Sequence, residues 1–391
     1  MASTIIGASV RISVKIPISI LFTHTASLIG GGNKVLLSLF AELDRSRYRP
    51  VSILPEHGPM ESELRKLDVE SAVLDVRPRR GRLSMIKSTM LLVARISREQ
   101  ISLVHANDPF TYHIASLAAG ITRTPGICHL HHPDQDAKSI EWAFARRPAV
   151  VLTPTQYVKE RVCDWLGAGA AEFVHAVGNP IDTKWFAPAQ DVGSVRDRVG
   201  MLRNVPQITI TGALAPHKGH DRFLLAARDI LKRHPEAKFN VVGSALSGDR
   251  LWAEKIQKLA REIGIEKSVR FWGFVSNSVS RDILAASDIF LLPSKIEGFG
   301  LVLAEALACG VPVVSSAIRP LDEIVVDGRA GFLVPPDEVG QFAQRACELL
   351  ESRELYKKCA EFGKNYVRTN FGAPAVVARI VERYDTILRP R

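Results

Sequence analysis

One pattern recurs along this chain: an apolar strand is followed by a glycine-containing turn and then by a helix with apolar residues at helical spacing. It occurs at residues 16–43, 208–227 and 288–308, which lie in both halves of the sequence. Strands and helices that alternate in this way form parallel sheets covered by helices on both faces. The pattern therefore predicts two doubly wound α/β domains facing each other, with ligands bound beyond the carboxyl ends of the strands.

Length and charge agree with this prediction and narrow the choice of partners. A chain of 391 residues is too long for one comfortable core, and its 46% hydrophobic content is that of a globular protein. The net charge of +10 is spread evenly, because residues 1–190 and 191–391 each carry an excess of five. Such a diffuse excess fits attraction to phosphates, anionic lipid or acidic glycans. Nothing in the sequence resembles a nucleic-acid-binding motif, so we expect no nucleic acid partner.

The cysteines and residues 1–15 indicate in which cellular compartment the protein is expected. Five cysteines without disulfide or metal spacing are expected to be reduced thiols of a cytoplasmic protein. No apolar run is long enough to span a membrane, so any membrane contact would be peripheral, at the inner face of the cell membrane. Arg11 and Lys15 interrupt residues 1–15, which are expected to form a loose extension and not a secretory signal.

The most specific motif follows the apolar strand at 288–292. Two carboxylates, Glu297 and Glu305, lie eight positions apart across a turn that opens a helix. Gly298 and Gly300 let the backbone turn tightly and let a ligand come close. The free amides at the helix start would stabilise an anion. The motif predicts a site for a phosphorylated, hydroxyl-rich ligand; the plain alternative is a strand–helix pair with two surface acids.

This stretch resembles the signature of retaining nucleotide-sugar glycosyltransferases of family 4. The similarity runs from Leu292 through Glu297 and Glu305 to residues 308–314, and it continues through residues 323–336. The resemblance extends over nearly the whole chain and implies the GT-B fold, in which two Rossmann-like doubly wound domains face each other across a cleft. It also implies transfer of a glycosyl group from a nucleoside-diphosphate sugar to an acceptor hydroxyl with retention, without a metal or a further cofactor.

The resemblance also implies how the chain is divided. Residues 1–187 would form the acceptor-side domain and residues 208–372 the nucleotide-sugar-binding domain. A tract with prolines, a glycine and charged residues at 188–207 would be the linker between them. The last helix, within residues 373–391, would pack back on the first domain.

In the first domain the candidates are a glycine loop and a histidine. Gly31 and Gly32 stand between a strand and a helix; alone they could form a flexible turn, but in the resembled family this loop lies over the donor diphosphate and the acceptor. On an extended strand His129 and His131 share a face and His132 takes the other, and no cysteine or carboxylate stands at zinc-ligand spacing, so we expect no metal. The resemblance places one histidine against the sugar; His131 matches best, and His129 remains an alternative.

In the second domain Lys218 stands beside a helix start and is the candidate cation for the donor diphosphate. The alternative is an ordinary exposed lysine. The resembled family usually has an arginine where this chain has Ala213, which puts the geometry of the phosphate site in question. His217 and Arg222 are the candidates to compensate.

The resemblance implies the remaining donor contacts. Glu305 would hold the ribose hydroxyls, and main-chain groups around Val275 would meet the nucleobase. Glu297 would grip sugar hydroxyls near the reacting carbon, as a nucleophile or as an electrostatic partner. The predicted catalytic residues are Glu297, His131 and Lys218, and the predicted donor-binding residues are Gly31, Gly32, Lys218, Val275, Phe299, Gly300, Leu301 and Glu305.

The acceptor is the least determined partner. Residues 77–98 hold seven Lys and Arg, no acid, and interleaved apolar residues. Such a segment can lie on an anionic membrane and deliver a lipid-linked acceptor. The alternative is an amphipathic core helix with a solvated basic face. The predicted setting is polysaccharide, lipopolysaccharide or glycolipid biosynthesis, with a saccharide or lipid-linked acceptor.

Other functions fit the same architecture. A sugar-nucleotide hydrolase or epimerase would lack a defined acceptor pocket. A nucleotide-sugar- or glycan-binding protein that has lost catalysis is favoured by Ala213. A nicotinamide oxidoreductase fits less well, because glycines 30–32 lack the spaced fingerprint of dinucleotide-binding proteins.

Overall fold

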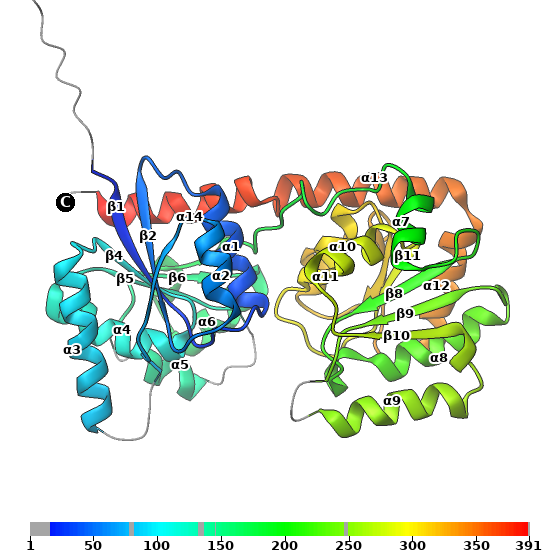
Figure 1. Ribbon diagram of the computed structural model, residues 1–391, viewed down its shortest axis with the longest axis horizontal. Helices are drawn as coiled ribbons and strands as arrows, with labels where there is room; N and C mark the ends of the chain where they lie inside the picture. The colour runs from blue at the N-terminus through cyan, green and yellow to red at the C-terminus, as the bar shows by residue number, and fades with distance from the viewer. Residues whose placement is uncertain (1–15, 78–81, 132–136, 145, 246–248, 390–391) are drawn as a thin grey trace, which may run out of the picture.

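The computed structural model describes residues 16–77, 82–131, 137–144, 146–245 and 249–389. The predicted loose extension, residues 1–15, lies outside this part of the chain. The described residues form two lobes, each built on one parallel sheet with helices on both faces (Figure 1). The predicted fold class, two Rossmann-like α/β domains, is confirmed.

The first sheet has the strand order β3-β2-β1-β4-β5-β6-β7, and all neighbouring strands are parallel. Helices α1 and α2 pack on one face, and α3 to α6 pack on the other. The strands are β1 Ile18–Thr23, β2 Tyr48–Leu54, β3 Glu70–Val73, β4 Leu103–Ala106, β5 Gly126–His129, β6 Val150–Thr153 and β7 Val174–Ala176. The helices are α1 Gly31–Glu42, α2 Pro59–Lys66, α3 Arg82–Arg98, α4 Pro109–Thr122, α5 Ala137–Ala143 and α6 Gln156–Leu166.

The second sheet repeats this arrangement with the order β10-β9-β8-β11-β12-β13. Its strands are β8 Gln207–Thr211, β9 Lys238–Val242, β10 Val269–Gly273, β11 Ile289–Leu292, β12 Val313–Ser316 and β13 Gly331–Val334. Its helices are α8 His220–Leu231, α9 Arg250–Glu262, α10 Asn277–Ala285, α11 Leu301–Ala308, α12 Val339–Glu351 and α13 Arg353–Asn370. In both sheets the strand order reverses beside the first strand, between β1 and β4 and between β8 and β11. Such reversal points are where doubly wound sheets bind ligands.

The segment predicted as a linker is not an irregular connection throughout. It contains α7 (Val192–Val199), which packs against α10 in the second domain. Arg196 of α7 is buried, donates to the carbonyl of Ala286 and pairs with Asp288 at 2.7 Å. The charged residues that suggested a linker therefore include a structural cation of the second domain.

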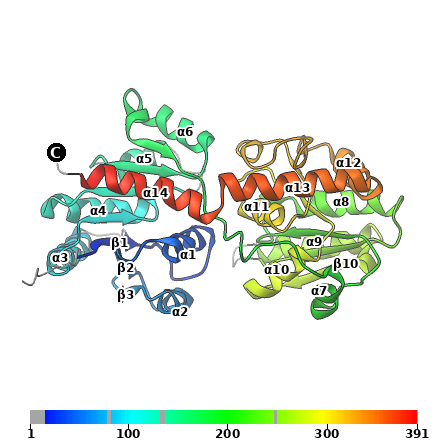
Figure 2. The ribbon, with the colours of Figure 1, turned by 90° about the horizontal axis from the view of Figure 1, so that it is seen from above.

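The end of the chain returns to the first domain. Figure 2 shows α13 and then α14 (Ala373–Leu388) running nearly in line along both lobes. Val376, Ile380 and Tyr384 of α14 are buried in the core that includes α1. The second domain is thus attached to the first by two crossings of the chain.

Candidate active site

At the reversal point of the second sheet, α8 starts directly against the end of β11. Gly219 precedes the helix with φ +76°, and a Cβ on it would lie 2.1 Å from the carbonyl oxygen of Pro293. Only glycine permits this approach. Arg222, in the first turn of α8, donates two hydrogen bonds to the same carbonyl, at 2.9 and 2.7 Å. This packing brings Lys218 to the loop that follows β11.

Lys218 and Glu297 form an ion pair, although they are far apart in sequence. The Nζ atom of Lys218 lies 2.9 Å from both carboxylate oxygens of Glu297, and the hydroxyl of Ser294 donates to one of them at 2.9 Å. The Glu297 side chain is 6% exposed and that of Lys218 is 23% exposed. Two predicted catalytic residues therefore meet in one partly buried pair, and Lys218 is not an ordinary surface lysine.

Helix α11 begins beside this pair. Gly300 takes the left-handed conformation with φ +91°, and no side chain caps the helix start at Leu301. A Cβ at Gly300 would come within 2.8 Å of the Leu321 side chain, so the turn requires glycine. The uncapped start can bind an anion through its main-chain N–H groups.

Two other predicted donor residues differ in how they can act. The Phe299 side chain is buried and packs edge-on against Phe371, with 5.3 Å between ring centroids, so only its main chain could meet a ligand. Val275 is half-buried and packs beside a small apolar cluster on α7 and α10. Both side chains therefore support the fold of the site.

Glu305 lies on α11 and is buried. Burial raises the pKa of its carboxyl group, and the Lys34 ammonium of α1, in the first domain, opposes that shift. The first turn of α1 also approaches α11 directly, since a Cβ on Gly31 would lie 3.5 Å from the Leu301 side chain. The glycine loop of the first domain and the α11 start of the second therefore face each other.

In the first domain His131 follows β5 and lies against the start of α1. A Cβ on Gly32 would come within 2.9 Å of Cδ2 of the His131 ring. His129 is fully buried and lies within hydrogen-bonding distance of His105, 3.3 Å between ring nitrogens. Burial lowers the pKa of His129, so it is neutral and belongs to the core. Of the two alternatives, His131 is the one beside the glycine loop, and His132 lies outside the described residues.

Side chains that could hold a metal ion are grouped away from the Lys218–Glu297 pair. Among the described residues, the group of three side chains close enough to share an ion is His234, Cys347 and Glu351. It lies behind the carboxyl end of α8, and Arg233 already pairs with Glu351. His105 of β4, His129 of β5 and His131 are in no such group in the described part of the chain.

The two domains also meet through residues whose role the sequence did not indicate. Both carboxylate oxygens of Glu323 accept hydrogen bonds from the first N–H groups of α6, those of Gln156 at 2.7 Å and Tyr157 at 2.8 Å. Arg319 pairs with Glu160 of the same helix at 3.2 Å. The sequence placed Glu323 in a motif but did not predict its contact with α6. The residues next to a side chain do not indicate which residues of another domain it will bind.

The two candidates to replace the missing arginine at Ala213 differ in their contacts. Arg222 is buried and holds the Pro293 carbonyl. His217 is exposed. Lys218 is the cation that pairs with Glu297 at the reversal point.

Two family models match consecutive parts of the chain. "Glycosyltransferase Family 4" matches residues 29–185, and "Glycosyl transferases group 1" matches residues 196–366. D-inositol 3-phosphate glycosyltransferase 2 of Catenulispora acidiphila is 33% identical over 218 residues, 54% of this chain and 50% of that protein. A GDP-mannose-dependent alpha-(1-6)-phosphatidylinositol monomannoside mannosyltransferase of Mycolicibacterium smegmatis is 27% identical over 60% of this chain and 61% of its own length. The chain spans about half the length of several of the curated relatives it matches.

Solved structures extend the likeness to the whole fold. HepE of Anabaena in complex with UDP superposes with a TM-score of 0.84 at 23% identity, covering 94% of this chain and 100% of that one. A glycosyltransferase of Rickettsia africae gives 0.85 at 19% identity, covering 96% and 100%. The resemblance seen in the sequence is confirmed by the two family models together with this fold: the chain belongs to the group 1 glycosyltransferases of family 4, with the GT-B architecture.

Proposed function

We propose that this protein transfers a sugar from a nucleoside-diphosphate sugar to an acceptor hydroxyl, with retention of configuration and without a metal ion. The observation that carries the proposal is the convergence of Lys218, Glu297 and the uncapped start of α11 at the reversal point of the second sheet. The glycine loop and His131 of the first domain face this edge. A cation, an anion-binding helix start and a carboxylate are the groups that departure of a diphosphate from a sugar requires.

The leaving diphosphate gains negative charge as its bond to the sugar breaks. The Lys218 ammonium carries three N–H donors, so it can keep one contact with Glu297 and offer another to a phosphate oxygen. The amides of Gly300 and Leu301 supply donors that need no proton transfer. Because Ala213 contributes no cation, Lys218 carries a larger share of this stabilisation than it would beside an arginine.

The carboxylates serve the sugar and the ribose. Glu297, buried beside Lys218, would accept hydrogen bonds from sugar hydroxyls and stabilise the positive charge that develops at the anomeric carbon. It could act as nucleophile or through its field alone. Glu305, an acceptor-only group when ionised, would hold both ribose hydroxyls. Closure of the cleft would exclude water, which would otherwise hydrolyse the donor.

The names of relatives and neighbours suggest the chemical class of the donor and of the acceptor. One structural neighbour was solved with UDP-glucose, and some relatives are named for GDP-mannose or for D-inositol 3-phosphate. We propose a hexose linked to UDP or GDP as donor, and a saccharide or lipid-linked acceptor of polysaccharide or glycolipid biosynthesis.

The test is donor hydrolysis by the purified protein. A panel of UDP-, GDP- and ADP-sugars is incubated in EDTA with the wild type and with Glu297→Ala. We expect slow release of one nucleoside diphosphate that persists in EDTA and is lost in the variant. If no diphosphate is released while calorimetry detects nucleotide binding, the chain is a binding protein, the alternative that Ala213 and the engaged Arg222 favour.

We also propose peripheral contact with an anionic bilayer through the outer face of α3. Leu83, Ile86, Met90 and Leu91 are exposed on this face, whereas Leu92 and Ile96 are buried beneath them. Helix α3 therefore packs on the core, as the alternative expected, and it also exposes large apolar side chains on its outer face. No helix among the described residues is long and apolar enough to cross a membrane. Insertion of these side chains at the interface would hold the protein on lipid.

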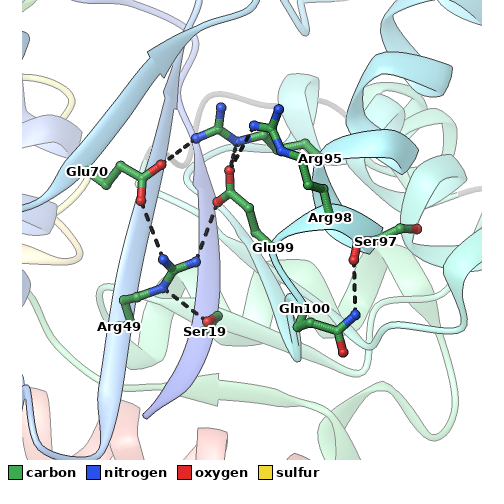
Figure 3. Close-up of polar contacts among 8 residues, drawn as sticks. All are labelled: Ser19, Arg49, Glu70, Arg95, Ser97, Arg98, Glu99 and Gln100. Carbon is green, nitrogen blue, oxygen red and sulfur yellow. Dashed lines mark hydrogen bonds and ion pairs between the residues drawn. The ribbon is translucent and has the colours of Figure 1, made fainter. Parts of the chain in front are cut away.

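At the carboxyl end of α3 the basic side chains are paired with acids. Arg95 pairs with Glu70 at 2.9 Å and with Glu99, and Arg98 also contacts Glu99 (Figure 3). Arg49 of β2 joins the same network. Glu70 of β3 and Glu99, directly after α3, neutralise this end of the helix, so we expect the exposed apolar side chains of α3 to contribute to membrane binding.

Flotation with anionic vesicles tests this contact. Leu83→Glu with Ile86→Glu should abolish flotation at physiological salt, because two charges would have to enter the bilayer interface. Leu251→Glu is the matched control, since Leu251 of α9 is 82% exposed and Leu83 is 84% exposed. Flotation of the double variant at the wild-type level would contradict the proposal, as would a wild type that fails to float.

A further inference from the structure

A chain of buried polar side chains lies behind the glycine loop of the first domain. It contains His24 at the end of β1, Asn33 in α1, Asn107 after β4 and His131 after β5. The first three are buried. The parallel sheet brings these four positions together because each follows, or begins the helix that follows, the carboxyl end of a neighbouring strand.

The orientation of the Asn33 amide is set by the glycine loop. Its Nδ2 donates to the carbonyl oxygens of Ala26 at 2.9 Å and Leu28 at 2.7 Å. Its Oδ1 is therefore the acceptor on the other side. This oxygen lies 2.8 Å from Nδ1 of His24 and 3.4 Å from Nδ2 of Asn107. Asn33 thus holds two loop carbonyls and orients two neighbouring side chains.

The orientation of Asn107 follows from that of Asn33. With its Nδ2 directed at Asn33, Asn107 presents Oδ1 to His131, and this oxygen lies 2.7 Å from Nε2 of the ring. An amide oxygen can only accept, so Nε2 of His131 carries a proton. In the neutral ring the lone pair then resides on Nδ1.

The same logic fixes His24. Its Nδ1 donates to Asn33, and its Nε2 accepts from the hydroxyl of Ser52 at 3.2 Å. Burial lowers the pKa of His24 to about 4, so this ring stays neutral at physiological pH. The hydrogen bonds from Ser52 through His24 and those from His131 through Asn107 then converge on Oδ1 of Asn33, with no donor facing a donor.

We infer that Asn33 and Asn107 are positioning residues that hold His131 in the tautomer protonated on Nε2 and tie it to the glycine loop. The inference rests on the proposed function, in which His131 and this loop contact the donor sugar.

The glycine loop and His131 then move as one unit. Gly32 lies against the ring, and Asn33, the next residue, is joined to it through Asn107. A displaced ring would displace the loop, and a misplacement of about 1 Å at a reacting centre can cost about 100-fold in rate. Replacement of Asn107 should therefore lower kcat by about 10- to 100-fold, with a smaller change in the KM for the donor.

The experiment measures the ring tautomer and the activity separately. Protein labelled with ¹⁵N-histidine is analysed by long-range ¹H–¹⁵N correlation, and the His131 signals are identified by their loss in His131→Gln. The wild type should show the Nε2-protonated pattern. Asn107→Leu, which removes the acceptor, should show a mixture of tautomers and the loss in kcat. Asn107→Asp, which keeps an acceptor oxygen at Nε2 but loses the donor to Asn33, should retain the proton on Nε2 and recover part of the loss.

The control is a variant that loses a buried hydrogen bond elsewhere in the first domain. Tyr384→Phe removes an equally buried hydrogen bond, the one between its hydroxyl and His105 at 2.7 Å, and should leave the His131 tautomer and kcat unchanged. A wild-type ring protonated on Nδ1, or a tautomer unaltered in Asn107→Leu, would overturn the inference. Because the ring signals need no turnover, a wild type with the Nε2 pattern and no activity would instead count against the proposed function.

Discussion

The two facing edges of the molecule share one architecture and differ in chemistry. At the reversal point of the first sheet, the glycine loop is held by the amide of Asn33, which Asn107 joins to His131; we call this the neutral edge after the amides that hold the loop. At the reversal point of the second sheet, the groups are charged: Lys218 pairs with Glu297 beside the start of α11. Neutral hydrogen-bonding groups suit sugar hydroxyls, and charges suit a diphosphate and a positive anomeric carbon. The fold thus supplies two similar edges, and in the proposed function their side chains would divide the reaction between them.

The largest effect should come from the charged edge. Lys218→Ala removes the cation and leaves the Glu297 carboxylate buried without its partner. We expect kcat/KM for donor turnover to fall about 1,000-fold. Steady-state assays measure this, and Lys295→Ala is the control, because Lys295 is half exposed and pairs with Asp337 outside the site. A loss below tenfold would mean that another group carries the phosphate charge.

The neutral edge should be sensitive to shape. Gly32→Ala places a methyl group 2.9 Å from the His131 ring, so the ring or the loop must move. We expect a loss of about 100-fold in kcat/KM. Gly30→Ala is the matched control, since a Cβ on Gly30 meets nothing within 4 Å. Equal activity of the two variants would show that contact between loop and ring is dispensable.

The contact that holds the two edges face to face should have a smaller effect. Glu323→Ala removes two hydrogen bonds to the start of α6, which are worth about 1.5 kcal/mol or more together. We expect about a tenfold rise in the KM for the donor and a larger radius of gyration in solution scattering. Asp322→Ala, next to it and half exposed, should change neither. An unchanged radius together with an unchanged KM would contradict a role for Glu323 in closure.

The smallest effect concerns stability. Burial raises the pKa of Glu305 above its ordinary value of 4.5, so the folded state binds this proton more tightly than the unfolded state does. The cost of ionising Glu305 is absent below that ordinary value and grows as pH rises toward the raised pKa. Glu305→Gln should therefore raise the Tm by about 2 °C at pH 7 and have no effect near pH 4. Calorimetric scans at pH 7 and pH 4 measure the change in Tm. A larger stabilisation by Glu305→Gln at pH 4 than at pH 7 would contradict the predicted pH dependence.

The sequence predicted the elements that follow local rules. The strand, glycine turn and helix at residues 16–43 are β1 and α1, and those at 288–308 are β11 and α11. Gly31 and Gly32 were expected before the helix and form its first turn, a difference within the usual uncertainty of helix ends. Helix α7 was missed because its glycine and charged residues, and the prolines on either side of it, are typical of a connection.

The site was predicted as a set of positions and not as a set of contacts. Lys218 and Glu297 were each singled out, but their pairing depends on the close packing of Gly219 against Pro293, which no spacing reveals. Asn33 and Asn107 were not singled out at all. An asparagine after a strand or in a first helical turn is common in ordinary loops, and its meaning depends on a partner that lies 74 residues away.

The central claim is that the protein transfers a sugar with retention and without a metal, between the charged edge of the second domain and the neutral edge of the first. The most direct measurement is the configuration of the first sugar released from the preferred α-linked donor, followed by ¹H NMR in EDTA before mutarotation. The account predicts that the α anomer appears first and that Glu297→Ala releases none. Initial release of the β anomer, or release that depends on a divalent cation, would contradict it.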